Sequence, residues 1–158
     1  MRSPFIMHLA LTLVWLFLSG IPTLGNFLVA LVATFILLSL FRRAIGCQDY
    51  VRRVSAFVVF VLRFLVEVIH SNIRIVSIAL RRGAKQVKGC YVQYDVEGLS
   101  DLEVFLIAQC IGMSPGSMAA EREGKKYLIL HCYPAAPAPE IQKRFDATLK
   151  QGILSFTR

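Results

Sequence analysis

The sequence predicts a membrane protein built from an α-helical hairpin, a long amphipathic or third transmembrane helix, and a small α+β domain of β-α-β-β-α order. Three observations lead to this prediction. Residues 3–41 contain no Asp, Glu, Lys or Arg, residues 42–83 combine many positive charges with apolar stretches, and residues 84–158 have the mixed composition of a soluble domain. The mean hydropathy of +0.58 is high for a soluble protein. We therefore divide the chain into residues 1–41, 42–83 and 84–158.

The uncharged run is long enough for two membrane crossings. A continuous helix over residues 3–41 would span roughly 58 Å at about 1.5 Å per residue, whereas the hydrocarbon core of a bilayer is about 30 Å thick. Gly and Pro interrupt the run at 20–26, which favours a turn between helices at 4–19 and 26–41, with Asn26 as the N-cap of the second. We prefer an uncleaved hairpin to a signal peptide because the apolar sequence resumes directly after the turn.

The net charge of +8 is concentrated immediately after the hairpin. Residues 42–88 carry ten positive and two negative charges, whereas residues 89–158 carry seven positive and eight negative charges. Cytoplasmic segments of membrane proteins are enriched in Lys and Arg, so we expect the N-terminus with Arg2 and the C-terminal domain to be cytoplasmic. A basic segment beside a membrane span suits anionic lipid. We expect no nucleic-acid binding because the C-terminal domain is close to neutral.

The segment at 50–82 predicts one long helix, since it contains no Gly or Pro. Its polar residues recur every three or four positions and form one stripe of an α-helix. The stripe consists of Arg63, Glu67, His70, Arg74, Ser77 and Arg81. The helix either crosses the membrane at 54–69 or lies in the plane of the cytoplasmic interface. The in-plane placement is favoured because a third crossing would carry the basic residues from Arg74 to Lys88 outside.

The remaining residues predict a small α+β domain after a basic linker at 83–88. A capping box at Ser100 and Glu103 begins a helix at 101–111. Strands are predicted at 87–96, 117–121 and 126–133, a hairpin turn at 122–125, and a last helix at 140–154. Helices packed on one face of a sheet would make one compact unit.

Arg63 and Glu67 are the candidate functional pair. Their i,i+4 spacing allows an ion pair, and charges within an apolar segment usually face protein. We expect the pair to be buried or at a subunit interface rather than to relay protons. The sequence predicts no catalytic site, no cofactor and no metal site, because its histidines lack acidic partners at a suitable spacing and its cysteines lack zinc-site spacing. These four cysteines are Cys47, Cys90, Cys110 and Cys132.

Five segments, in this order and spacing, resemble one known family. They are Leu13–Gly20, Arg42-Arg43, Phe64–Val76, the turn Ser114-Pro115-Gly116-Ser117, and Tyr127–Cys132. The two serines of the turn replace threonines of the family pattern, which keeps both hydroxyl groups. We interpret this segment as a plain turn in which Gly116 adopts a positive φ, rather than as an anion-binding nest. Over nearly all its length the chain is similar to the E subunit of the multisubunit Mrp-type (Mnh, Pha) monovalent cation/proton antiporters of bacteria.

The resemblance implies a non-catalytic, multi-pass subunit of the bacterial inner (cell) membrane, in a complex that exchanges Na⁺ or K⁺ for H⁺. It implies a role in assembly and stability, with the other subunits of the complex as partners. Two alternatives stay open. One is a homologous small subunit of a membrane-bound hydrogenase-type complex. The other is a membrane-anchored peripheral enzyme, which would need a pocket with converging polar groups.

Overall fold

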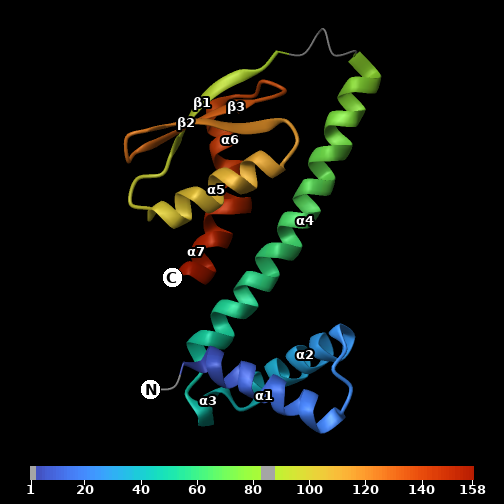
Figure 1. Cartoon of the computed structure of the whole chain (residues 1–158). Helices are drawn as coiled ribbons and strands as arrows, with labels where there is room; N and C mark the ends of the chain where they lie inside the picture. Colours follow the sequence, from blue (N-terminus) through green and yellow to red (C-terminus); the bar gives the residue numbers. More distant parts are fainter. Residues whose placement is uncertain (1–2, 83–87) are drawn as a thin grey trace. The chain divides into compact units, whose positions relative to one another are not determined.

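The structure is a computed structural model that describes residues 3–82 and 88–158, without the side chains at 81 and 82. It divides into two compact units, Met1–Ser55 and Ala56–Arg158. Arg2 and the greater part of the predicted linker, residues 83–87, lie outside the described residues. The chain has a helical N-terminal region with one long apolar helix, followed by a small three-stranded sheet (Figure 1).

The first unit consists of short apolar helices. It contains α1 (Pro4–Ser19), α2 (Leu24–Leu40), α3 (Arg42–Ile45) and the beginning of α4 (Gln48–Arg82). The bounds predicted for the first helix agree with those of α1, and Pro4 occupies its first position, where no N–H is needed. With 16 and 17 residues, α1 and α2 are about 24 and 26 Å long, which is less than the thickness of a bilayer core.

The N-cap of α2 is Thr23, so the prediction of Asn26 in this role is wrong. The Thr23 side chain accepts a hydrogen bond from the backbone N–H of Asn26, and the helix begins two residues earlier than predicted. The amide of Asn26 instead ties the hairpin turn together. It donates to Oγ of Ser19 at 2.6 Å and to the carbonyl of Ile21 at 2.8 Å. Thr23 caps the helix, whereas the Asn26 side chain is held by its hydrogen bonds within the turn.

Polar groups also join the helices of this unit. Oγ1 of Thr12 and Oγ1 of Thr34 are 3.0 Å apart, and both residues are buried. Nε2 of His8 is 3.0 Å from the carbonyl of Leu31, and Nδ1 is 2.6 Å from the hydroxyl of Tyr50. A carbonyl only accepts, so Nε2 of His8 carries a hydrogen and donates to Leu31, while Nδ1 and the Tyr50 hydroxyl share the second hydrogen bond. This cluster links α1, α2 and the beginning of α4 through satisfied hydrogen bonds.

The second unit contains the rest of α4 and an α+β domain. The domain runs β1 (Cys90–Asp95), α5 (Asp101–Met113), β2 (Ser117–Glu123), β3 (Tyr127–Cys132), and a C-terminal helix. This helix comprises α6 (Ala138–Phe145), the π-helical segment η2 (Asp146–Lys150) and α7 (Gln151–Thr157). The strand order is β1-β3-β2, and β3 pairs antiparallel with both neighbours.

Several boundaries in this unit differ from the predicted ones. β2 continues to Glu123, beyond the predicted end at 121. The alternation of more and less exposed residues fails after Ala119, but the pairing of β2 with β3 shifts its register between Ala119 and Glu121, and the strand continues. The C-terminal helix begins at Ala138 rather than 140 and ends at Thr157 rather than 154. Pro139 lies within its first turn, a position that a helix tolerates although proline suggested a loop.

The core of the second unit lies between the sheet and the helices. Tyr94, Ile107, Leu130, Leu149 and Ile153 have at most 1 % of their surface exposed. Phe60 and Phe64 of α4 belong to the same cluster. A Cβ at position 152 would lie 2.5 Å from Cδ2 of Phe60, so the glycine there permits the close approach of α7 to α4.

The predicted capping box of α5 is present and has a further partner. Ser100 and Glu103 make the two reciprocal hydrogen bonds. Glu103 is 3 % exposed and also accepts hydrogen bonds from Nε of Arg158 at 3.1 Å and from Oγ1 of Thr157 at 2.9 Å. The Arg158 guanidinium is the main cause that lowers the pKa of Glu103 to about 2. The carboxylate therefore fastens the end of the C-terminal helix to the first turn of α5.

Candidate functional site

Helix α4 has two unlike faces within the second unit. One face carries Phe60, Phe64 and Ser71, which are buried against the domain. The other face is apolar and exposed from Phe57 to Leu80. We call it the exposed apolar face, and it consists of Phe57, Val58, Val59, Leu62, Leu65, Val66, Ile69, Ile73, Val76 and Leu80. Each of these side chains is 46–82 % exposed, and such a continuous apolar surface marks a contact with lipid or protein.

Basic residues follow one edge of the exposed apolar face. Arg63, His70 and Arg74 are exposed, and their spacing of seven and four places them on one stripe of α4. The helix thus combines a buried face, an apolar exposed face and a polar edge, as the sequence pattern predicts for an amphipathic helix. Within the described residues, the segment Gln48–Leu80 is also the one helix that is long and apolar enough to cross a membrane.

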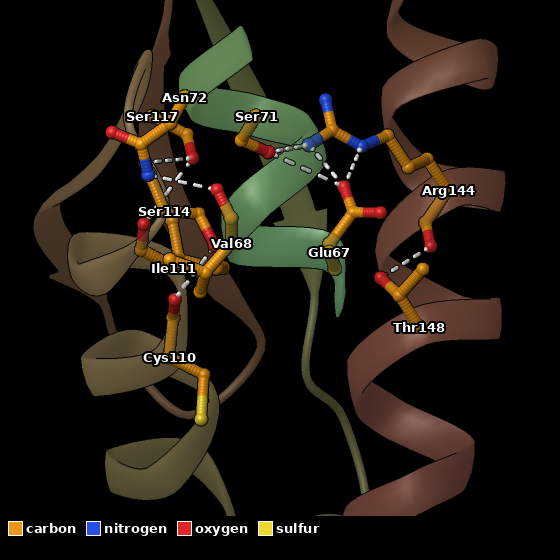
Figure 2. A network of polar contacts seen from close by, with 10 residues as sticks. All are labelled: Glu67, Val68, Ser71, Asn72, Cys110, Ile111, Ser114, Ser117, Arg144 and Thr148. Atoms are coloured by element: carbon orange, nitrogen blue, oxygen red, sulfur yellow. Dashed lines mark hydrogen bonds and ion pairs between the residues drawn. The ribbon is translucent and has the colours of Figure 1, made fainter. Parts of the chain in front are cut away.

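Glu67 lies on the border of the buried face and pairs with the C-terminal helix. Its Oε1 accepts hydrogen bonds from Nη2 of Arg144 at 2.6 Å and from Nε at 3.0 Å. Nη2 of Arg144 also donates to Oγ of Ser71 at 3.1 Å. Figure 2 shows Arg144 reaching from the C-terminal helix toward these two residues of α4. About a quarter of each charged side chain is exposed, 23 % for Glu67 and 28 % for Arg144.

Glu67 therefore has a different partner from the one that the sequence suggested. Arg63 is exposed, and within residues 3–82 and 88–158 the ion pair of Glu67 is formed with Arg144. The guanidinium of Arg144 makes two hydrogen bonds to one carboxylate oxygen and a third to a neighbouring hydroxyl, a geometry that an exposed i,i+4 arginine does not match. The contact joins α4 to α6 and fixes the domain on this helix.

The turn Ser114-Pro115-Gly116-Ser117 closes the C-terminal end of α5. Oγ of Ser114 donates to the carbonyl of Cys110, and Oγ of Ser117 donates to the carbonyls of Ile111 and Ser114, each at 3.2 Å (Figure 2). Gly116 has a φ of +91°, as expected for this turn, and its carbonyl accepts from the N–H of Tyr133 at 2.7 Å. The hydroxyls thus add hydrogen bonds at the end of α5, where the carbonyls of Ile111 and Ser114 also accept from the backbone N–H groups of Ser114 and Ser117.

A hollow on the surface of the domain is lined by charged residues. It has a volume of about 790 Å³ and lies at the beginning of α5. Its walls contain three ion pairs, Arg122–Asp101 at 2.8 Å, Lys126–Glu97 at 3.2 Å and Arg158–Glu103 at 3.1 Å. Among the residues that the structure describes, no group of three or more His, Cys, Asp or Glu side chains is placed to hold a metal ion.

The cysteines are free and mostly shielded from solvent. Cys47 and Cys132 are buried, and Cys90 and Cys110 are half-buried. Burial raises the pKa of both Cys110 and Cys132, which makes these thiols poor nucleophiles at neutral pH.

Reasoning from the sequence missed Arg144 and Arg158. Arg144 pairs with a residue 77 positions away, and Arg158 with one 55 positions away. The sequence contained one weak, local indication that Arg144 faces the core. Arg144 directly precedes Phe145, an apolar residue of the last predicted helix that is buried on the core side.

Comparisons with known proteins agree with the sequence pattern. The chain is 25 % identical over 154 residues to the E1 subunit of the Na(+)/H(+) antiporter of Staphylococcus epidermidis, covering 97 % of this chain and 96 % of that protein. It is 23 % identical to the E subunit of the Na(+)/H(+) antiporter of Alkalihalophilus pseudofirmus, over the full length of both.

Solved structures of membrane complexes contain similar chains. One is in the membrane-bound sulfane sulfur reductase, an archaeal respiratory membrane complex, with a TM-score of 0.54, 19 % identity, and coverage of 94 % of this chain and 97 % of that one. Another is in the Mrp complex of Dietzia sp. DQ12-45-1b, with a TM-score of 0.48, 16 % identity, and coverage of 63 % and 94 %. Because the MNHE family of Na⁺/H⁺ ion antiporter subunits matches residues 8–155, the chain belongs to that family.

Proposed function

We propose that the chain is an accessory, non-catalytic membrane subunit of a multisubunit Na⁺(K⁺)/H⁺ antiporter, and that it supports assembly and stability of the complex. The observation that carries this proposal is the exposed apolar face of α4, which a protein outside a membrane or complex would have to hide. Other subunits and membrane lipid are its partners. The family to which the chain belongs supports the choice of an antiporter complex.

The ionisable groups of the chain support an accessory role. Coupled cation and proton transport generally needs intramembrane groups that change their protonation. In the hairpin, His8 is held by two hydrogen bonds, and in α4 the carboxylate of Glu67 is engaged by Arg144. Both groups therefore act as structural links. The ion path belongs to other subunits in this proposal, and Arg63, which is exposed, is available to contact one of them.

The packing of the second unit favours an in-plane placement of α4. The domain covers α4 from Phe60 to Ile75, a stretch of about 24 Å at about 1.5 Å per residue. A crossing helix would draw the exposed charges of the domain, such as Asp95 and Glu97, into the bilayer at a cost of several kcal/mol each. In the plane of the interface, the apolar face enters the lipid and the domain stays in water.

Deletion of the subunit tests the accessory role. We expect antiport in membrane vesicles to fall in proportion to the amount of assembled complex, because the chain stabilises the other subunits without carrying ions. Blue-native electrophoresis measures the complex, and a pH-sensitive dye with added Na⁺ or K⁺ measures antiport. A fully assembled complex that has lost antiport would contradict the proposal, since activity per complex should be unchanged.

The proposed orientation places the N-terminus and the C-terminal domain in the cytoplasm. Gln151 is exposed on α7, so a Gln151→Cys reporter can be introduced after the four native cysteines are replaced. We expect an impermeant thiol reagent to label this reporter in inverted vesicles and to leave it unlabelled in intact cells. Efficient labelling of intact cells would refute the orientation and support a third crossing.

The parent complex has one rival. The fold is shared with a chain of an archaeal respiratory membrane complex, so a hydrogenase-type complex is the second candidate. Affinity purification of the intact assembly separates the two, because a hydrogenase-type complex would bring redox subunits with it.

A further inference from the structure

We propose that a pocket between α4, the Ser114–Ser117 turn and α6 binds a phosphate group, and that the source of this phosphate is the headgroup of an anionic phospholipid. The pocket has a volume of about 180 Å³ and is lined by Arg74, Gly116, Ser117, Tyr133, Glu140 and Arg144, among others. This volume is ample for a group of five heavy atoms. The step from phosphate to lipid rests on the proposed in-plane placement of α4.

Two arginines give the pocket its character. Arg74 is exposed, and within the described residues it has no hydrogen bond or ion pair. It lies near enough to Arg144 to be repelled by that guanidinium and attracted by Glu67. Arg144 uses Nε and Nη2 for Glu67 and Ser71, and Nη1 carries no hydrogen bond within the described part of the chain (Figure 2). A phosphate between the two guanidiniums would relieve their repulsion and accept several charge-assisted hydrogen bonds.

The third charged side chain of the pocket opposes an anion. Glu140 lines the same space from the first turn of α6 and is exposed. The lining thus carries two positive charges and one negative charge. Because Glu67 already offsets the charge of Arg144, the attraction for an anion comes from Arg74 and from the N–H groups on Nη1 of Arg144. The carboxylate of Glu140 supplies a test in the opposite direction, because its neutralisation should strengthen binding.

The pocket lies beside the surface that would meet lipid. Arg74 follows Ile73 at about 100° around the helix, and Ile73 and Val76 belong to the exposed apolar face. With that face in the acyl region of the interface, Arg74 is at the depth of the headgroups, where arginine side chains commonly contact phosphate. The apolar face and the pocket together would then hold one lipid by its chains and its phosphate.

The test uses the purified full chain in a neutral detergent. Native mass spectrometry measures the binding of phosphatidylglycerol, of diacylglycerol without phosphate, and of inorganic phosphate. We expect phosphatidylglycerol to bind, and Arg74→Ala to weaken its binding by about tenfold, the effect of losing one charge-assisted hydrogen bond. Arg63→Ala is the matched control, since Arg63 lies on the same stripe outside the pocket, and it should change binding less than about twofold. Glu140→Gln should raise the affinity.

Several results would overturn the proposal. Equal losses in Arg74→Ala and Arg63→Ala would mean that the stripe attracts lipid by charge alone and that the pocket is not a site. Diacylglycerol binding as tightly as phosphatidylglycerol would exclude the phosphate. Inorganic phosphate binding as tightly as the lipid would exclude the lipid as its source. These measurements use the isolated chain, so their outcome is independent of whether deletion of the subunit impairs assembly.

Discussion

Gly116→Ala is expected to destabilise the second unit more than a glycine-to-alanine substitution at any other of its turns. The backbone at this position has a φ of +91°, which costs a residue with a Cβ about 1–2 kcal/mol. The added Cβ would also lie 2.3 Å from the carbonyl oxygen of Tyr133 and 2.9 Å from Cδ1 of Ile75. The carbonyl belongs to the backbone directly after the central strand β3, so it cannot move away cheaply. Such overpacking typically adds about 1–3 kcal/mol.

The expected total of about 3 kcal/mol should lower the unfolding temperature by about 10 °C or more for a unit of this size. Thermal unfolding of the purified chain in detergent, followed by circular dichroism, measures the effect. Gly124→Ala is the matched control. Its φ of +60° is also left-handed, but a Cβ there meets no atom within 4 Å. Equal losses in the two variants would mean that the contacts with Tyr133 and Ile75 contribute nothing.

This glycine also makes the Ser114–Ser117 turn a structural junction of the second unit. Ile75 belongs to α4 and Tyr133 directly follows β3, so both elements meet the turn at Gly116. The two serine hydroxyls satisfy the end of α5 at the same place. The turn therefore joins the end of α5, the end of the central strand β3 and the long helix α4.

Local patterns in the sequence predicted the helices well. The uncharged run and its Gly-Pro turn gave the bounds of α1, and the absence of Gly and Pro from 50–82 gave nearly the full length of α4. The capping box at Ser100 and Glu103 has both of its hydrogen bonds. Each of these signals depends on residues within a few positions of one another, and such short-range physics is legible in one sequence.

The partners of charged residues were not predictable in the same way. Glu103 was assigned to a helix cap, which is correct, but its hydrogen bonds to Thr157 and Arg158 depend on how the two ends of the domain meet. Glu67 has an arginine four residues before it, and the spacing favours this nearby residue as its partner instead of the distant Arg144. A spacing of i,i+4 shows that two side chains can meet, but the packing of a second helix decides whether they do.

A double-mutant cycle on Glu67 and Arg144 should therefore give a clear coupling energy. Glu67→Gln and Arg144→Met each keep most of the side-chain volume and remove one charge. We expect each single change to lower the free energy of unfolding by about 1–3 kcal/mol, because the partner loses its charge-assisted hydrogen bonds. This is less than the loss for a fully buried pair, since about a quarter of each side chain reaches solvent, 23 % and 28 %. The double variant should lose less than the sum, with a coupling of about 1–2 kcal/mol.

The same cycle on Arg63 and Glu67 is the control that separates the two possible partners. Arg63 is exposed on α4, so Arg63→Met should change stability by less than about 0.5 kcal/mol and show no coupling to Glu67→Gln. Chemical unfolding of the purified chain in detergent supplies all the values. A coupling to Arg63 as large as that to Arg144 would restore the intrahelical pair. No coupling to Arg144 would mean that its contact with α4 is dispensable, and that the core around Phe60 and Phe64 alone holds the domain on the helix.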